Sequence, residues 1–338
     1  MIKLKKLEGG DRIALIAPSG TLITPKEFGC TKKAIGLFEK LNLKLHPMKY
    51  SKIRGEEFDY STMPDNRILD LNYAIRDPSM NAIYCIEGGF FSYQMVTEMN
   101  KSLRNRIKKG IATEIDYECF KNNPKPFLGF CDNTSLTQTL YAKTGVPTFQ
   151  CLVLTSIYEA SENKKEQEVK SEEHAKNWEK HFTNLLIEGK PIDIKAEPLR
   201  KGSAKGTFVG GNLFTFVKHT PDEFCNLDDK ILLIEEAGED LDLVKSLIQG
   251  IKKKPYADKL SAVVAGQFIH PNYFRKNFDK KEIEKYENEV KDYLAGNFSC
   301  PVLWNIPFGH YHMDCHTLPI GVKAEVEGNS LRIDSPFE

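Results

Sequence analysis

The sequence has no excess of charge of either sign. Its 338 residues carry 47 basic and 47 acidic side chains, so the formal net charge is +0. Proteins that bind nucleic acid or anionic membrane surfaces usually do so through an excess of positive charge. We therefore expect a small or neutral partner, with neither nucleic acid nor a membrane among the partners.

Long apolar runs and paired cysteines are also missing. The first apolar run, residues 13–17, stops at Pro18 and is too short for a signal peptide or a membrane span. The eight cysteines lie far apart and show no CxxC spacing. Without a secretory leader, such a pattern predicts free thiols in a cytoplasmic protein.

Glycine-rich phosphate loops are absent as well. The chain contains neither G-x-G-x-x-G nor G-x-x-x-x-G-K, which argues against a nucleotide site. It does contain Gly88 and Gly89, which follow the apolar segment "AIYCIE". Paired glycines let a backbone approach another group closely and can direct two N–H groups at one point, as in an oxyanion hole. A plain turn between a strand and a helix is the alternative interpretation.

What is present first is an alternation of strand and helix patterns. Apolar segments at 12–18, 43–48 and 82–89 alternate with helical patterns at 32–41 and 66–76. A helix over 92–99, a strand over 126–130 and a helix over 135–145, capped by Gly145, follow in the same manner. This order predicts an α/β fold with a parallel, helix-covered sheet, whose ligands bind at the carboxyl ends of the strands.

The length and a change in composition predict two domains. Residues 161–180 contain 11 charged positions out of 20, which is typical of a solvated connection or an exposed helix. We therefore divide the chain into an N-terminal domain at 1–160, a charged connection at 161–204 and a mixed C-terminal domain at 205–338. The last of these is expected to contain strand patterns, the helices 241–249 and 280–294, and a hairpin around Gly328 and Asn329.

A candidate nucleophile lies in "KPFLGFCDNTSL". Here a strand pattern ends, Cys131 stands alone at the bend, and a helix begins at Asp132. This is the local plan of a nucleophile elbow, in which the helix N-terminus favours a thiolate and the amide of Asp132 can donate to an oxyanion. The G-x-S-x-G consensus is not met, so a small buried thiol at a strand end remains the alternative interpretation.

Two further segments offer partners for a nucleophile. The segment "ILLIEEAGED" places Glu235 at the end of a buried strand, where a carboxylate needs a partner such as a histidine, while Glu236 is expected to be solvated. The segment "PFGHYHMDCHTLPIG" contains His310, His312 and His316. One of these histidines could act as a general base, and the three together are a possible zinc site.

Six blocks of the sequence resemble those of the LD-carboxypeptidases, a serine peptidase family that includes the microcin C self-immunity peptidases. They occur in order over nearly the whole chain: "GDRIALIAPSG", "NRILDLNYAIRDPSMNAIYCIEGG", "KPFLGFCDNTSL", "GTFVGGNL", "ILLIEE", and "PFGH" followed by "TLPIGV". The stretch "IDYECFKNNPKPFLGF" resembles the microcin-immunity branch most.

The resemblance implies a Rossmann-like N-terminal domain, a smaller β-rich C-terminal domain and a cytoplasmic homodimer without metal or cofactor. It also implies a Ser-Glu-His triad at the domain interface that cleaves an amide next to a free carboxylate. The substrate would be a small peptide or peptide conjugate, either a cell-wall tetrapeptide or a peptidyl-adenylate. By motif, Glu235 and His310 match the acid and the base, and His312 is the alternative base because the following loop is slightly longer than the family pattern.

The departure from the family pattern is at the nucleophile. Where the family block reads G-[YF]-S-D-x-T, this chain has Cys131 in place of the serine. A thiolate paired with histidine forms more easily than an alkoxide, so a natural thiol nucleophile is chemically sound. A weakly active or silent descendant that binds peptide carboxylates, and a deliberate substitution that traps substrate, are the two other interpretations. If Cys131 is a natural thiol nucleophile, the amides of Asp132 and Gly89, next to Gly88, are the expected oxyanion donors.

Overall fold

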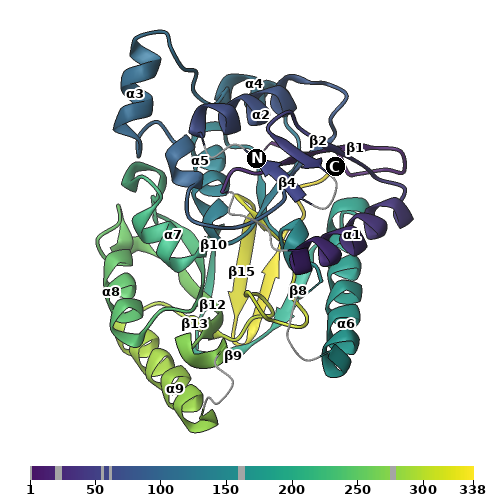
Figure 1. Ribbon diagram of the computed structural model, residues 1–338. Coiled ribbons are helices and arrows are strands. Elements are labelled where there is room, and N and C mark those ends of the chain that lie inside the picture. The colour runs from purple at the N-terminus through teal and green to yellow at the C-terminus, as the bar shows by residue number, and fades with distance from the viewer. Residues whose placement is uncertain (1, 20–24, 55–56, 61–62, 159–163, 275–278) are drawn as a thin grey trace.

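Two sheets form the framework of the protein (Figure 1). The computed structural model describes residues 2–19, 25–54, 57–60, 63–158, 164–274 and 279–338. The first sheet has the strand order β14-β7-β6-β5-β1-β2, and its strands are parallel except for β14. Their bounds are β1 Arg12–Ile16, β2 Lys44–Pro47, β5 Ala82–Cys85, β6 Phe127–Gly129, β7 Thr148–Gln150 and β14 Leu318–Ile320. The predicted α/β fold with a parallel N-terminal sheet is confirmed.

Helices accompany this first sheet, and α2 buries an apolar stripe. In α2, Ile68, Leu71 and Ile75 recur at helical spacing and are fully buried, and the helix ends at Asp77 because Pro78 follows. Gly145 closes α5 with a φ of 72°. The bounds are α1 Pro25–Lys40, α2 Pro64–Arg76, α3 Lys101–Lys108, α4 Tyr117–Asn122 and α5 Thr134–Thr144, with a small hairpin of β3 Ser51–Arg54 and β4 Glu57–Tyr60.

One predicted helix of this half is wrong. Instead of a helix over 92–99, the chain makes a single 3-10 turn, Ser92–Met95, and is extended at Val96. β-Branched residues at this point disfavour a continuing helix. Asn100 then begins a separate helix, because its side chain accepts a hydrogen bond from the amide of Leu103 at 3.0 Å.

The second sheet is mixed and has eight strands in the order β8-β16-β15-β10-β11-β12-β13-β9. The four neighbours from β10 to β13 run parallel, and the outer strands run antiparallel. The predicted hairpin is confirmed as β15 and β16. The bounds are β8 Ile192–Lys195, β9 Glu197–Arg200, β10 Ser203–Asn212, β11 Lys230–Ala237, β12 Ala262–Ile269, β13 Val302–Trp304, β15 Lys323–Glu327 and β16 Ser330–Ile333.

Both faces of the central strands of this sheet are buried. In β11, Ile231 and Leu233 join the large core that also contains the first sheet, whereas Leu232 and Ile234 join a separate core under α8 and α9. Such a continuous apolar run is typical of parallel strands covered on both sides. The helices are α7 Leu213–Lys218, α8 Leu241–Ile251 and α9 Lys280–Asn297, and single 3-10 turns occur at Leu154–Ser156, Asp222–Phe224, Ala257–Lys259 and Pro271–Phe274.

The charged segment between the two halves forms α6, Lys164–Phe182, which continues into a π-helical turn, Thr183–Ile187. Figure 1 shows α6 on the opposite side of the second sheet from α8 and α9. Its Trp178 and Phe182 are buried in the large core, and the ring of Trp178 lies 5.2 Å from that of Phe38. The segment is therefore an amphipathic helix that packs against the N-terminal half.

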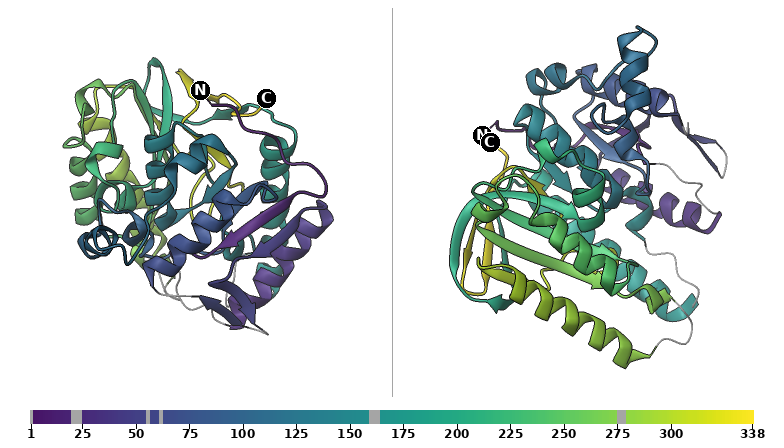
Figure 2. Two further views of the ribbon diagram at one scale, coloured as in Figure 1. Left: turned by 90° about the horizontal axis from the view of Figure 1, so that it is seen from above. Right: turned by 90° about the vertical axis from the view of Figure 1, so that its left-hand side faces the viewer.

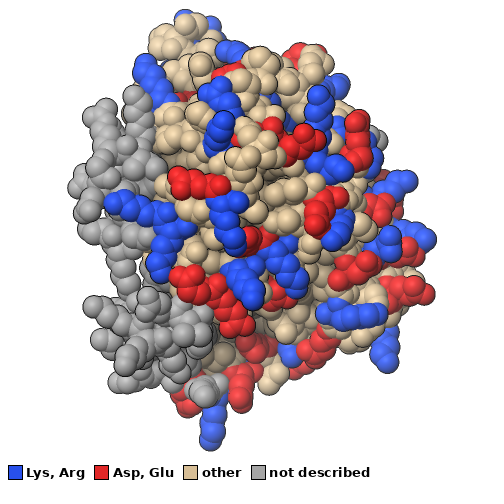
Figure 3. Space-filling model, turned by 90° about the vertical axis from the view of Figure 1, so that its right-hand side faces the viewer, with Lys and Arg blue, Asp and Glu red and all other residues tan. Residues whose placement is uncertain are grey.

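The ends of the chain are tied together. The termini lie side by side (Figure 2), and the amide of Leu4 donates to the carbonyl of Pro336 at 3.0 Å. Basic and acidic side chains are interspersed on the face drawn in Figure 3, as the balanced charge predicts. Among the described residues, none of the helices combines the length and apolarity needed to cross a membrane.

Candidate active site

The elbow at Cys131 adopts the conformation that the sequence predicts. Cys131 follows β6 and begins a 3-10 turn, Cys131–Asn133, that leads into α5. Its φ is +59°, which is uncommon for a residue other than glycine. Left-handed backbone at a single residue between a strand and a helix is characteristic of a nucleophile elbow and stores local strain. The turn presents the side chain of Cys131 at the carboxyl end of β6.

The second half of the molecule brings an acid and a base to this cysteine. Glu235 is fully buried in β11, and Nδ1 of His310, in the loop after β13, lies 2.8 Å from Oε2 of Glu235. Cys131 is another side chain that interacts with the His310 imidazole, and it favours the charged form of the ring. Because Nδ1 is engaged by the carboxylate, Nε2 is the ring nitrogen that remains for the thiol. The three residues selected from the sequence thus form one chain of contacts between the two halves.

The surroundings of His310 favour its charged form. Burial opposes a charged imidazole, but the Glu235 carboxylate and Cys131 outweigh it and raise the pKa of His310 well above its usual value. The ring of Phe130 lies 4.7 Å from the imidazole and covers it on one side. The site therefore supports proton transfer from the thiol to the imidazole.

The paired glycines lie against Cys131 and Ser19. A Cβ on Gly88 would be 3.2 Å from Cβ and 3.6 Å from Sγ of Cys131, so a side chain there would press on the cysteine. Gly89 has a φ of +137°, and a Cβ there would be 3.0 Å from the carbonyl oxygen of Ser19. The backbone at this turn thus depends on the absence of side chains at two consecutive positions.

Ser92, which sequence reasoning missed, joins the glycine turn to the elbow. Its amide donates to Oδ2 of Asp132 at 2.7 Å, and its hydroxyl donates to the carbonyl of Asp132 at 2.6 Å. Asp132 is buried, and its second carboxylate oxygen lies 3.5 Å from Nδ1 of His219. The side chain of Asp132 therefore fixes the spacing between its own backbone amide and the Gly88–Gly89 turn.

The expectation that Glu236 is solvated is wrong. Glu236 is buried beside Glu235 and accepts hydrogen bonds from Asn212 Nδ2 at 3.0 Å and from the amides of Phe214 and Ala237. It accepts them because it lies over the N-terminus of α7, where unpaired amides point at an acceptor. Burial and the neighbouring Glu235 raise the pKa of Glu236 to about 7.

Asn212 is a second residue that sequence reasoning missed. It caps α7 through its side-chain oxygen, which accepts from the amide of Thr215, and its Nδ2 also lies 3.2 Å from Oε1 of Glu235. One amide group therefore holds both carboxylates. An asparagine directly before a helical pattern, as in "GGNLFTF", is the signal that could have identified the cap.

The zinc set considered from the sequence does not form. His310 pairs with Glu235, whereas Nε2 of His316 lies 3.8 Å from Oδ2 of Asp314. In the described part of the chain, the group with metal-ligand geometry is His181, Asp314 and His316. His312 accepts a hydrogen bond from the amide of Asp314 and does not join that group.

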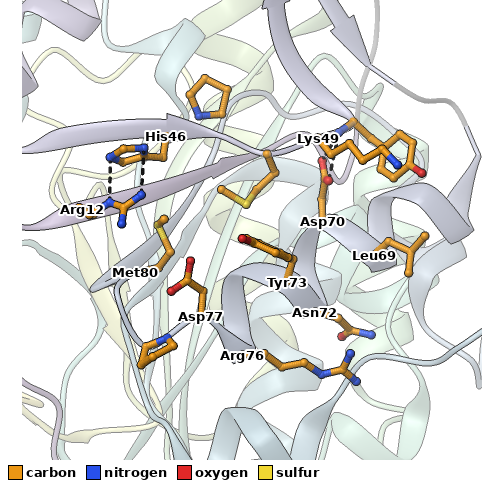
Figure 4. A pocket seen from close by; sticks show the side chains of 14 residues that line it. Arg12, His46, Lys49, Leu69, Asp70, Asn72, Tyr73, Arg76, Asp77 and Met80 are labelled. Carbon is orange, nitrogen blue, oxygen red and sulfur yellow. Dashed lines mark hydrogen bonds between the residues drawn. The ribbon is translucent and has the colours of Figure 1, made fainter.

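A pocket of about 900 Å³ lies elsewhere, between the edge strand β2 and α2 (Figure 4). Its lining contains none of the three residues of the contact chain. Arg12 pairs with His46 at 3.0 Å, and Asp70 accepts from the amide of Tyr50 at 3.0 Å. Both of these polar pairs are satisfied within the protein.

Comparison with known proteins gives matches over both halves. Models of the LD-carboxypeptidase N-terminal and C-terminal domains match residues 13–151 and 205–326. The putative carboxypeptidase YocD of Bacillus subtilis is 27% identical over 96% of each chain, and the probable murein peptide carboxypeptidase of the same organism is 25% identical over 95% of this chain and 90% of its own. The structure of the microcin C7 self-immunity protein MccF with glutamyl sulfamoyl guanosine superimposes with a TM-score of 0.72, at 19% identity and 99% coverage of both chains.

Proposed function

Because the chain belongs to the LD-carboxypeptidase family, we propose that it hydrolyses an amide bond next to a free carboxylate, with Cys131 as the nucleophile. The observation that carries this proposal is the contact chain from Cys131 through His310 to Glu235, with a left-handed elbow at the thiol. An inert buried thiol needs neither the strained backbone nor the aligned base.

The reaction begins with proton transfer from the thiol of Cys131 to Nε2 of His310, whose charged form Glu235 stabilises. Sγ then attacks the carbonyl carbon, and the amides of Asp132 and Gly89 hold the negative oxygen. His310 returns the proton to the leaving amine as the C–N bond breaks, which leaves a thioester on Cys131. Water, deprotonated by His310, cleaves that thioester and releases the carboxylate.

The substrate class in this proposal is a small peptide or peptide conjugate. The relative named for murein peptides and the solved structure that contains an aminoacyl sulfamoyl nucleoside indicate the two chemical types to test. Both types join an amino acid to a larger group and carry a carboxylate. A dimer in the cytoplasm is the state we expect for the active protein, and light scattering coupled to size exclusion tests the dimer.

Incubation of the purified chain with a panel of muropeptide tetrapeptides and peptidyl-adenylate analogues tests the proposal. We expect cleavage of at least one member, and no cleavage by Cys131→Ala. If the folded chain cleaves none of them, or if Cys131→Ala cleaves equally well, the peptidase proposal fails.

Cys131→Ser tests whether sulfur itself is the working nucleophile. We expect the serine variant to be slower, because the pairing with His310 favours loss of the thiol proton over loss of a hydroxyl proton. A faster serine variant would instead identify the thiol as a loss of activity. Alkylation by iodoacetamide provides a check without substrate, since Cys131 should react faster than the similarly half-buried Cys119 and Cys300.

A further inference from the structure

A second cluster of chemically active side chains lies outside the contact chain of Cys131. Nε2 of His181 lies 2.7 Å from Oδ1 of Asp314, and Nε2 of His316 lies 3.8 Å from Oδ2 of the same carboxylate. The two imidazole rings are stacked with their centroids 3.5 Å apart. His181 belongs to α6, whereas Asp314 and His316 belong to the loop that leads to β14. The cluster therefore joins two segments far apart in the sequence.

The atoms in this cluster have the spacing of a metal-ligand set. One ligand atom from each of the three residues lies within 4.8 Å of the others. Tetrahedral zinc with bonds of about 2.0–2.1 Å holds neighbouring ligand atoms about 3.3 Å apart. His181 Nε2 lies 2.7 Å from Oδ1 of Asp314 and His316 Nε2 lies 3.8 Å from Oδ2, so these separations fall on either side of this value. The stacked rings, with centroids 3.5 Å apart, would have to open so that both Nε2 atoms point at one ion.

The backbone around the cluster is held in place by the rest of the fold. Asn177, one turn before His181 on α6, donates to the carbonyl of Met313 at 2.9 Å. The amide of His316 donates to the carbonyl of Pro307 at 2.9 Å. A π-helical turn, Thr183–Ile187, begins two residues after His181, and such turns often occur at functional sites. The ligand side chains therefore project from backbone that is already fixed.

The cluster is also open to solvent on one side. A pocket of about 210 Å³ is lined by His181, His316 and Lys180, among others, and the side chain of Asp314 is 46% exposed. The pocket gives a cation a way in and supplies water for the remaining position. The ammonium group of Lys180 at the pocket limits the affinity for a cation and favours water or chloride as the last ligand.

From this geometry we propose that His181, Asp314 and His316 bind one zinc ion, with a solvent ligand in the fourth position. Two imidazole nitrogens and one carboxylate oxygen are a donor set that zinc accepts readily. The ion would fasten the loop that carries His310 to α6. It takes no part in bond cleavage, so the proposal is independent of the peptidase activity and can succeed or fail without it.

Metal binding by the full, untagged chain after treatment with EDTA is the test. Titration calorimetry with Zn²⁺ should give one site per chain, and Asp314→Asn and His181→Gln should each weaken binding at least ~100-fold. His46→Gln, which changes a histidine outside the cluster, should bind as the unaltered chain does. Cys131→Ala should also bind Zn²⁺ as the unaltered chain does, because the thiol of Cys131 and the imidazole of His310 are not part of the proposed site.

Cobalt substitution identifies the donors independently. Co²⁺ at the proposed site should give visible bands of a tetrahedral nitrogen and oxygen set, without a thiolate charge-transfer band. A thiolate band would place a cysteine among the ligands, and loss of binding in Cys131→Ala would move the metal to Cys131; either result would overturn the proposal. Absence of stoichiometric binding at micromolar Zn²⁺ would overturn it as well.

Thermal unfolding covers the case in which a variant folds poorly. Zn²⁺ should raise the Tm of the unaltered chain, and EDTA should reverse the rise. Asp314→Asn retains the size of the side chain at a partly exposed position, so it should fold, and its Tm should not respond to Zn²⁺. A response equal to that of the unaltered chain would contradict the assignment of Asp314 as a ligand.

Discussion

The two sides of the Cys131–His310 contact are built by different means. On the N-terminal side, the decisive features are backbone features: positive φ at Cys131 and Gly89, and no side chain at Gly88. On the C-terminal side, they are hydrogen bonds among buried polar side chains, with His310 on Glu235 and Asn212 on both adjacent carboxylates. One side depends on steric space and the other on charge.

This difference predicts how each side fails. The geometry of the N-terminal side depends on the backbone, so it does not change with pH, but a single added methyl group can disturb it. A side built from buried carboxylates tolerates small changes in shape, but it responds to protonation and to the loss of one hydrogen-bond donor. The experiments below perturb the connection first and then each side in turn.

Removal of His310 breaks the connection between the sides and should have the largest effect. His310→Ala leaves Cys131 without a base and Glu235 without its partner, so kcat/KM should fall at least ~1,000-fold. The measurement is steady-state hydrolysis of the best substrate in the panel. His312→Ala is the control and should stay within a few-fold of the unaltered enzyme; the reverse ranking would transfer the role of base to His312.

Titration of Glu236 should affect stability by about 3 kcal/mol, since its pKa rises from an ordinary value of 4.5 to about 7 on folding. Between these values the unfolded chain loses this proton before the folded chain does, so the folded state loses stability as pH rises from about 4.5 to about 7. Chemical denaturation of the unaltered chain and Glu236→Gln should give a difference in unfolding free energy that declines over this window.

Above pH 7 that difference should be constant. A difference that is flat across the whole range would show that folding does not raise the pKa of Glu236, and would contradict the description of this side as governed by protonation.

An added methyl group at Gly88 tests the N-terminal side of the contact, which depends on the backbone. In Gly88→Ala the new Cβ would lie 3.2 Å from Cβ of Cys131, which displaces the thiol or the turn. Relief of this contact needs a shift of a few tenths of an ångström. Because misplacement near 1 Å costs about 100-fold in rate, we expect kcat to fall between about 10-fold and about 100-fold, with little loss of stability. Gly296→Ala, on α9 with open space around it, is the matched control and should leave kcat unchanged.

A kcat for Gly88→Ala within a few-fold of the unaltered enzyme would show that the elbow tolerates the added atom. The description of this side as limited by steric space would then be wrong.

On the C-terminal side, which depends on buried charge, the loss of one hydrogen-bond donor should have the smallest of these effects. Asn212→Ala removes the cap of α7 and the donor to both carboxylates, which should lower the unfolding free energy by about 2 kcal/mol. Asn100→Ala removes a cap of the same kind, on α3, that touches no carboxylate, and should cost about 1 kcal/mol. Equal losses in the two variants would assign the whole effect to capping.

Local patterns in the sequence predicted most of the elements, although not the break at Val96, and the three residues of the contact chain. Cys131, Glu235 and His310 each stand where an apolar strand pattern or its following turn ends, and the topology of α/β sheets brings such ends together. Trp178 and Phe182 recur at helical spacing inside a highly charged segment, and both are buried in the structure. These features depend on neighbours within a few positions, which a sequence displays directly.

Local sequence patterns could not predict contacts between segments that lie far apart in the chain. The burial of Glu236 depends on amides at the start of α7, and the tie between Ser92 and Asp132 joins residues 40 positions apart. The pairing of His181 with Asp314 spans 133 positions. No periodicity or turn signal encodes such pairs. The zinc site considered from "HYHMDCH" therefore took all its ligands from one segment and did not include His181 of α6.

The place of β14 in the first sheet bears on how the protein is made. β14, Leu318–Ile320, pairs with β7, yet it follows β7 by roughly half of the chain. A ribosome therefore translates everything between β7 and β14, His310 included, before this sheet receives its edge strand. A nascent chain that stops short of His310 carries the thiol of Cys131 without the imidazole, so the contact chain can form only after this late segment has been made.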